Sequence, residues 1–133
     1  MSTLAVGTIK SISSAAPVFQ NTSGVEKGQL CKAWVNFNGN SFGIRDSFNV
    51  GSVTDHGTGQ YTVNFATNMS NDDYCVVAQH SLNPHNSITH GVLYIYDESS
   101  QTTSGVRVHN CNDGGSSQTI DKNIVCVSIF GDN

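Results

Sequence analysis

The sequence predicts an all-β fold, an antiparallel β-sandwich of jelly-roll-like type that follows an extended N-terminal segment. Two observations carry this prediction. Short runs of alternating apolar and polar residues recur along the chain between clusters of Asn, Asp and Gly, which favour turns. No window shows the apolar periodicity of a helix. We therefore expect very little helix and strands over residues 30–38, 44–54, 60–67, 74–81, 91–97, 105–110 and 122–131.

The clearest local pattern is a β-hairpin around the turn DHGTG at residues 55–59. The incoming run contains Val50 and Val53, and the outgoing run, YTVNF at residues 61–65, alternates strictly. Two glycines within three residues can take the positive φ that a tight reversal requires. This stretch predicts two paired strands and indicates no chemistry.

Residues 1–27 have a different pattern, because their apolar spacing fits neither a regular helix nor a regular strand. The turn-forming residues NTSG at 21–24 end this segment. We expect residues 1–27 to be extended and to contact other subunits of an oligomer, and residues 28–133 to form the β-sandwich domain.

The last predicted strand is apolar on both faces between Ile124 and Phe130. A strand with one face in solvent does not have this pattern. Either the strand is central in the sandwich, or another subunit covers one of its faces.

Composition excludes several classes of protein. The chain has 133 residues, the length of one domain, and only 12% of them are charged, with a net charge of −4. This balance provides no basic face for nucleic acid and no polybasic membrane anchor. We find no run of eighteen apolar residues and no leader pattern. We therefore expect that the chain is made in the cytosol and does not insert into a membrane.

The chain contains four cysteines, Cys31, Cys75, Cys111 and Cys126, and no C-x-x-C pair. In a reducing compartment, buried thiols behave as small hydrophobic groups. We expect four free thiols, with one disulfide as the main alternative, and neither a zinc site nor a cofactor.

Four sequence pieces occur here in order: KAWVNFNG at residues 32–39, IRDSFNV at 44–50, TDHGTG at 54–59 and YTVNF at 61–65. Together with the opening STLAVGTI at 2–9, they resemble a segment of tail-fibre and related virion proteins of bacteriophages, especially marine ones. The resemblance covers roughly residues 2–78, and residues 40–43 depart from the pattern. It implies a virion protein, made in the bacterial host cytoplasm, that forms a homotrimer and contacts other virion proteins.

We therefore expect a non-enzymatic virion structural protein, of tail-fibre or appendage type, that binds a host-surface glycan. One alternative is a capsid decoration protein with no host ligand, and another is a surface-polysaccharide hydrolase. The adjacent acids at residues 72–73 and 97–98 are poorly placed for hydrolysis, because neighbouring strand residues point to opposite faces. A hydrolase would need carboxylates distant in sequence.

The predicted glycan contact is the loop SLNPHNSITH at residues 81–90, supported by residues 97–104. Loops on a rigid sheet often carry binding residues, and amides and imidazoles both donate to and accept from sugar hydroxyls. Trp34, Tyr94 and Tyr96 are the aromatic residues able to stack on a sugar ring, and both tyrosines share one strand face. The predicted ligand-binding residues are Asn83, His85, Asn86, His90 and Trp34.

Three histidines, His80, His85 and His90, recur at intervals of five residues. The interval is wider than usual zinc spacings, and the Asn-Pro step within the loop breaks any helix, so we expect no metal. The alternative left open is a threefold axis that gathers three copies of one histidine.

Overall fold

The computed structural model describes residues 6–10, 17, 19–81, 91–112 and 119–131, and the chain divides into two units, Met1–Leu30 and Cys31–Asn133. In the first unit, β1 (Phe19–Gln20) pairs with β2 (Glu26–Gly28) in an antiparallel hairpin. The side chain of Asn21 closes its turn by accepting the backbone N–H groups of Ser23 and Val25. The predicted turn at residues 21–24 is confirmed, but it lies inside a hairpin that the sequence did not predict.

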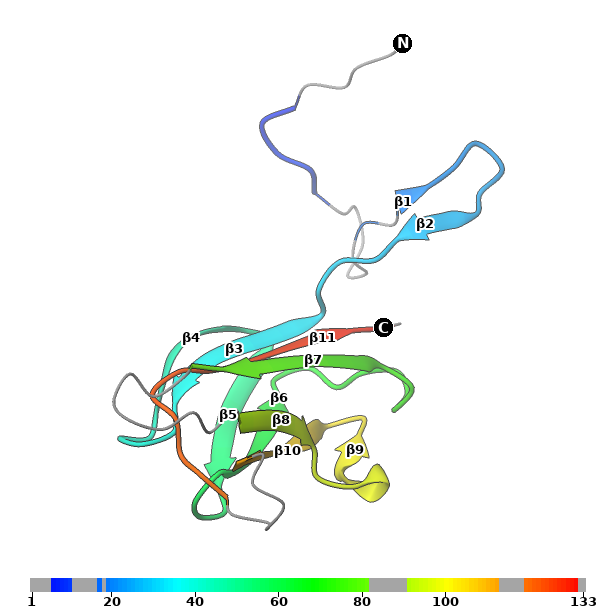
Figure 1. Ribbon diagram of the computed structural model, residues 1–133. Coiled ribbons are helices and arrows are strands. Elements are labelled where there is room, and N and C mark those ends of the chain that lie inside the picture. The colour runs from blue at the N-terminus through cyan, green and yellow to red at the C-terminus, as the bar shows by residue number, and fades with distance from the viewer. Residues whose placement is uncertain (1–5, 11–16, 18, 82–90, 113–118, 132–133) are drawn as a thin grey trace. The chain divides into compact units, whose positions relative to one another are not determined.

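The second unit contains two antiparallel sheets, which Figure 1 shows as two layers of strands. The first sheet has the order β4 (Gly43–Phe48), β3 (Ala33–Asn38), β11 (Val125–Phe130), β7 (Cys75–His80). The second has the order β5 (Val50–Asp55), β6 (Gln60–Phe65), β10 (Gly105–Asn112), β8 (Gly91–Ile95), and β9 (Gln101–Thr102) also pairs with β10. Within the described residues the only helix is the short 3₁₀ turn η1 (Glu98–Ser100). The predicted all-β class is confirmed.

The inward side chains of both sheets form one hydrophobic core. The strands supply it by strict alternation, so that every second residue of β3, β6 and β11 is buried. Two edge-to-face aromatic pairs join the layers: the ring centroids of Phe37 and Tyr61 are 4.9 Å apart, and those of Phe65 and Tyr74 are 5.6 Å apart.

The hairpin predicted around residues 55–59 is confirmed, because β5 and β6 pair antiparallel. The expectation of one strand over residues 44–54 is wrong. The chain turns at Asn49, where φ is +52°, and β4 and β5 belong to different sheets. The Asn49 amide group donates to the carbonyl oxygens of Lys32 and Thr67 and accepts the Thr67 N–H, which fixes this corner.

β11 is an inner strand of its sheet, with β3 and β7 on its two sides. Val125, Val127 and Ile129 are buried, while Cys126 and Ser128 are half-buried on the outward face. Of the two interpretations of this apolar strand, the structure therefore shows the central position. All four cysteines are free, as predicted.

Candidate functional site

The outward face of the second sheet carries an aromatic and polar surface that we call the tyrosine face. It is built by β8, β10 and β6, whose alternate residues point away from the core. Two rows of cross-strand neighbours run across it. One row contains Tyr94, His109 and Gln60, and the other contains Tyr96, Arg107 and Thr62.

Tyr94 and Tyr96 are each 41% exposed, whereas Leu93 and Ile95 on the same strand pack against the core. The strand is therefore half-exposed, with both tyrosines on its outer side. His109 contacts both tyrosine rings, with centroid distances of 5.4 Å to each. The three rings form one aromatic surface.

Hydrogen bonding and burial tune two groups of this surface. The hydroxyl of Tyr94 is 3.1 Å from the buried thiol of Cys111, and this hydrogen bond, followed by burial, raises the pKa of Tyr94. Burial first and the Arg107 charge second lower the pKa of His109 below its usual value of 6.5. This shift favours the neutral imidazole of His109, which can both donate and accept hydrogen bonds.

Arg107 is held in place by two contacts on this face. Its guanidinium carbon lies 4.1 Å from the centroid of the Tyr96 ring, a cation–π distance. Its Nη2 donates to Oε1 of Gln60 at 2.7 Å, while its buried Nε has no hydrogen-bond partner among the described residues. The guanidinium plane is thus oriented before any ligand arrives.

Amides and hydroxyls continue the face over β6 and β5. Asn64 donates to the hydroxyl oxygens of Ser52 and Thr54 at 3.0 and 2.9 Å. Nε2 of His56 lies 2.9 Å from the hydroxyl of Thr62. Groups of this kind match the mixed donors and acceptors of a sugar, next to rings that can pack against its apolar C–H face.

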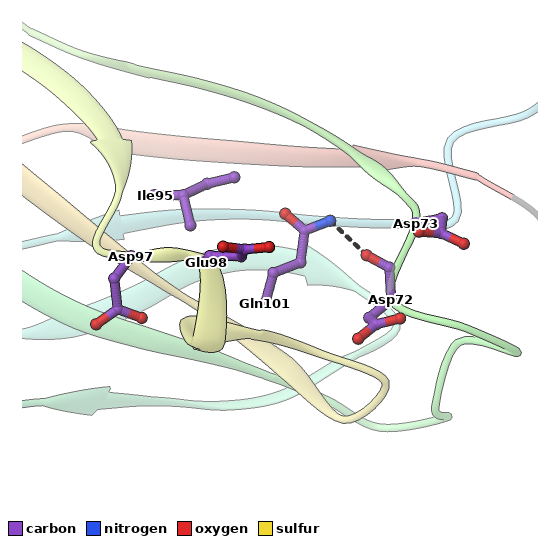
Figure 2. Close-up of a pocket in the computed structure, with 6 residues that line it drawn as sticks. All are labelled: Asp72, Asp73, Ile95, Asp97, Glu98 and Gln101. Atoms are coloured by element: carbon purple, nitrogen blue, oxygen red, sulfur yellow. Dashed lines mark hydrogen bonds between the residues drawn. The ribbon is translucent and has the colours of Figure 1, made fainter.

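A second feature is a pocket of about 420 Å³ in which two acidic pairs meet. Figure 2 shows Asp97 and Glu98, which lie at the start of η1 after β8, together with Asp72 and Asp73 from the segment before β7. Gln101 connects the two segments, because its amide donates to the carbonyl oxygens of Asp72 and Tyr74 at 2.6 and 2.7 Å. Among the described residues that line the pocket there is no lysine or arginine. The lining residues are Asp72, Asp73, Ile95, Asp97, Glu98 and Gln101.

The electrostatics of this pocket do not match those of a hydrolase at Asp97. The hydroxyls of Ser100 and Ser99 donate to its carboxylate and hold the pKa of Asp97 below its usual 3.8. A glycosidase needs a general acid whose pKa is raised, so that it carries a proton to the leaving group. Asp97 is suited to remain ionised instead.

Of the residues that the sequence grouped as ligand-binding, the structure describes only Trp34. Asn83, His85, Asn86 and His90 lie outside the described residues. Trp34 is half-buried on the outward face of the first sheet, between Phe48 and Ser128. Because the sheets share one core, Trp34 and the tyrosines face opposite sides of the unit.

Sequence reasoning identified Tyr94 and Tyr96 as neighbours on one face, but it missed Arg107 and His109. A signal for them exists, since their alternation with Val106 and Val108 places both residues on the outward side of β10. The sequence also did not predict that the two acidic pairs, at residues 72–73 and 97–98, line one pocket. That arrangement depends on contacts between segments far apart in the chain.

Across the described part of the chain, no group of three or more His, Cys, Asp or Glu side chains is arranged to hold a metal ion. The same residues include no helix that is long and apolar enough to cross a membrane. Comparison with known proteins finds no matching family model, no matching curated protein and no matching solved structure.

Proposed function

We propose that this chain is a non-enzymatic virion protein of a bacteriophage, of tail-fibre or appendage type, that binds a host-surface glycan through the tyrosine face. The observation that carries the binding proposal is the pair of half-exposed rings, Tyr94 and Tyr96, beside an oriented Arg107. A sugar needs an apolar platform and hydrogen-bonding groups at its edge, and this face offers both. The phage assignment rests on the resemblance of residues 2–78.

The fold proposed with this function is a β-sandwich made by the two sheets, with the extended segment and the jelly-roll-like arrangement kept as predictions. A homotrimer is also part of the proposal. Large apolar side chains of the first unit are exposed, which suits a segment that contacts other subunits or other virion proteins. These residues are Val6, Ile9, Phe19, Val25 and Leu30. Light scattering should give about three times the chain mass.

The binding test uses purified full-length protein and surface polysaccharide extracted from bacteria that the phage infects. The variant Y94A/Y96A should lose binding by about tenfold or more, because aromatic anchors dominate such contacts. The control F48S removes a ring that is 55% exposed on the other sheet, and it should bind as the unchanged protein does. Equal binding by all three proteins would contradict the proposed location.

The loop predicted from sequence gives a competing outcome for the same assay. If the variant N83A/H85A/N86A loses binding while Y94A/Y96A keeps it, the loop is the contact surface. If the unchanged protein binds no surface polysaccharide, a capsid decoration protein becomes the better account.

The acidic pocket is the specific observation that keeps hydrolysis as a second candidate. Its walls bring four carboxylic acids together from two segments. A hydrolase would shorten the polysaccharide, and D72N/E98Q would abolish that shortening. We expect chain length, measured by size-exclusion chromatography, to stay constant during incubation.

A further inference from the structure

We infer that the tyrosine face selects an acidic sugar, with the guanidinium of Arg107 pairing with the carboxylate of a uronic acid or a similar residue. This inference rests on the proposed function and names the ligand class for the same face. Three observations support this inference: the position of the Arg107 charge, the neutral groups that contact it, and the net charge of the whole chain.

Arg107 is the only lysine or arginine within the five strands of the second sheet. The other basic side chains of the same unit are placed differently: Lys122 is buried, Arg45 lies on β4 of the other sheet, and Lys32 directly precedes β3 of that sheet. The positive charge of the tyrosine face is therefore concentrated at one point, between the Tyr96 ring and Gln60.

The two contacts that hold the Arg107 guanidinium are both with neutral groups, so they leave its charge available. Its hydrogen bond goes to Gln60, a neutral amide, and its other contact is the face of Tyr96. Asp97 is near enough for the Arg107 charge to help lower its pKa, but its carboxylate accepts the hydroxyls of Ser99 and Ser100 at 2.8 and 2.6 Å. A planar guanidinium binds a carboxylate through charge-assisted hydrogen bonds.

The net charge of the chain makes this selection local. With a net charge of −4, the protein repels polyanions in general. Non-specific attraction therefore cannot explain binding of an acidic polysaccharide, and such binding requires an oriented cation beside a platform for the sugar ring. The tyrosine face provides this combination.

The test is an array of acidic oligosaccharides, each printed beside a counterpart whose carboxylates have been reduced to alcohols. The unchanged protein should bind its acidic ligand about tenfold or more tightly than the reduced form. It should also lose affinity as salt is raised, because the pair is partly exposed to solvent.

R107Q should lose this preference for the acidic form and keep weak binding to both forms through the tyrosine rings. R45Q, which removes an equal charge from the other sheet, should behave as the unchanged protein. Circular dichroism should be used to check that each variant is folded. If R107Q does not fold, the test uses R107K and the salt dependence of the unchanged protein. R107K should weaken the preference for the acidic form, because a lysine ammonium cannot form the planar, paired hydrogen bonds of a guanidinium.

Equal binding of acidic and reduced oligosaccharides by the unchanged protein overturns this inference and leaves the proposed function standing. Binding of no oligosaccharide on the array overturns both. A preference for the acidic form that R107Q retains assigns the carboxylate to another part of the chain and also overturns the inference.

Discussion

Tyr61 is the residue whose alteration tests the packing of the second unit most simply. Its ring is fully buried against Phe37, and its hydroxyl donates to Oδ1 of Asp121, which also accepts the backbone N–H of Gly59 at 2.7 Å. This contact ties β6 to the segment that leads into β11. Burial first, then the hydrogen bond and the charge of Asp121, raise the pKa of Tyr61 above its usual value of 10.0.

The substitution Y61F keeps the ring and removes this link. A hydrogen bond to a charged group contributes about 1.5–3 kcal/mol to stability. Because Asp121 still accepts the Gly59 N–H in Y61F, its carboxylate is not left unpaired, and we expect the free energy of unfolding to fall by about 2 kcal/mol. For a unit of this size the midpoint of thermal unfolding should fall by about 6–10 °C.

Urea unfolding followed by circular dichroism measures the loss for Y61F directly. The control is Y96F, since the Tyr96 ring is 41% exposed and keeps its contact with Arg107 after the change. We expect Y96F to stay within about 0.5 kcal/mol of the unchanged protein. If Y61F is equally stable, the Asp121 contact does not hold the segment as we describe.

Three further predictions concern backbone, pH and thiols. G59A should destabilise the fold by more than about 2 kcal/mol in urea unfolding, because φ is +68° and the new Cβ would lie 2.5 Å from the Asn110 carbonyl oxygen, whereas G43A has open space and should be neutral. Burial is the main cause that raises the pKa of Tyr74 from 10.0 to about 12. As pH rises, the Tyr74 hydroxyl therefore loses its proton in the unfolded chain before it does so in the folded protein. The free energy of unfolding should fall between pH 10 and 12, and it should fall less steeply in Y74F. With a thiol reagent, exposed Cys75 should react before buried Cys111, and reductant should leave the melting temperature unchanged.

Each of these has an outcome that contradicts it. Equal stability of G59A and G43A would show that the close approach at Gly59 is absent in solution. Equal slopes for Y74F and the unchanged protein between pH 10 and 12 would mean that the Tyr74 side chain is not buried as described. A drop of many degrees with reductant would indicate a disulfide.

The fold class could be predicted from sequence because its main signal is local. Alternation over residues 60–65 places Tyr61, Val63 and Phe65 on one face, and the glycines beside them permit the turn. The corner at Asn49 could not be predicted in the same way. Its direction depends on hydrogen bonds to Lys32 and Thr67, each more than fifteen positions away.

The candidate site shows the same division between local and distant information. That Tyr94 and Tyr96 share a face follows from the period of a strand. That Arg107 lies over Tyr96 requires the register of β10 against β8, which alternation does not supply. In the acidic pocket, Gln101 joins two distant segments by donating to the carbonyl oxygens of Asp72 and Tyr74, a contact that alternation does not supply either.

We propose that a host-surface glycan binds the outward face of the second sheet, and titration of isotope-labelled protein with that glycan tests this proposal most directly. Nuclear magnetic resonance spectra should show the largest shifts at Tyr94, Tyr96, Arg107 and His109, with Phe48 on the other sheet unchanged. Shifts centred on Trp34 and Phe48, or an unchanged spectrum with a glycan to which the phage adsorbs, would contradict the account.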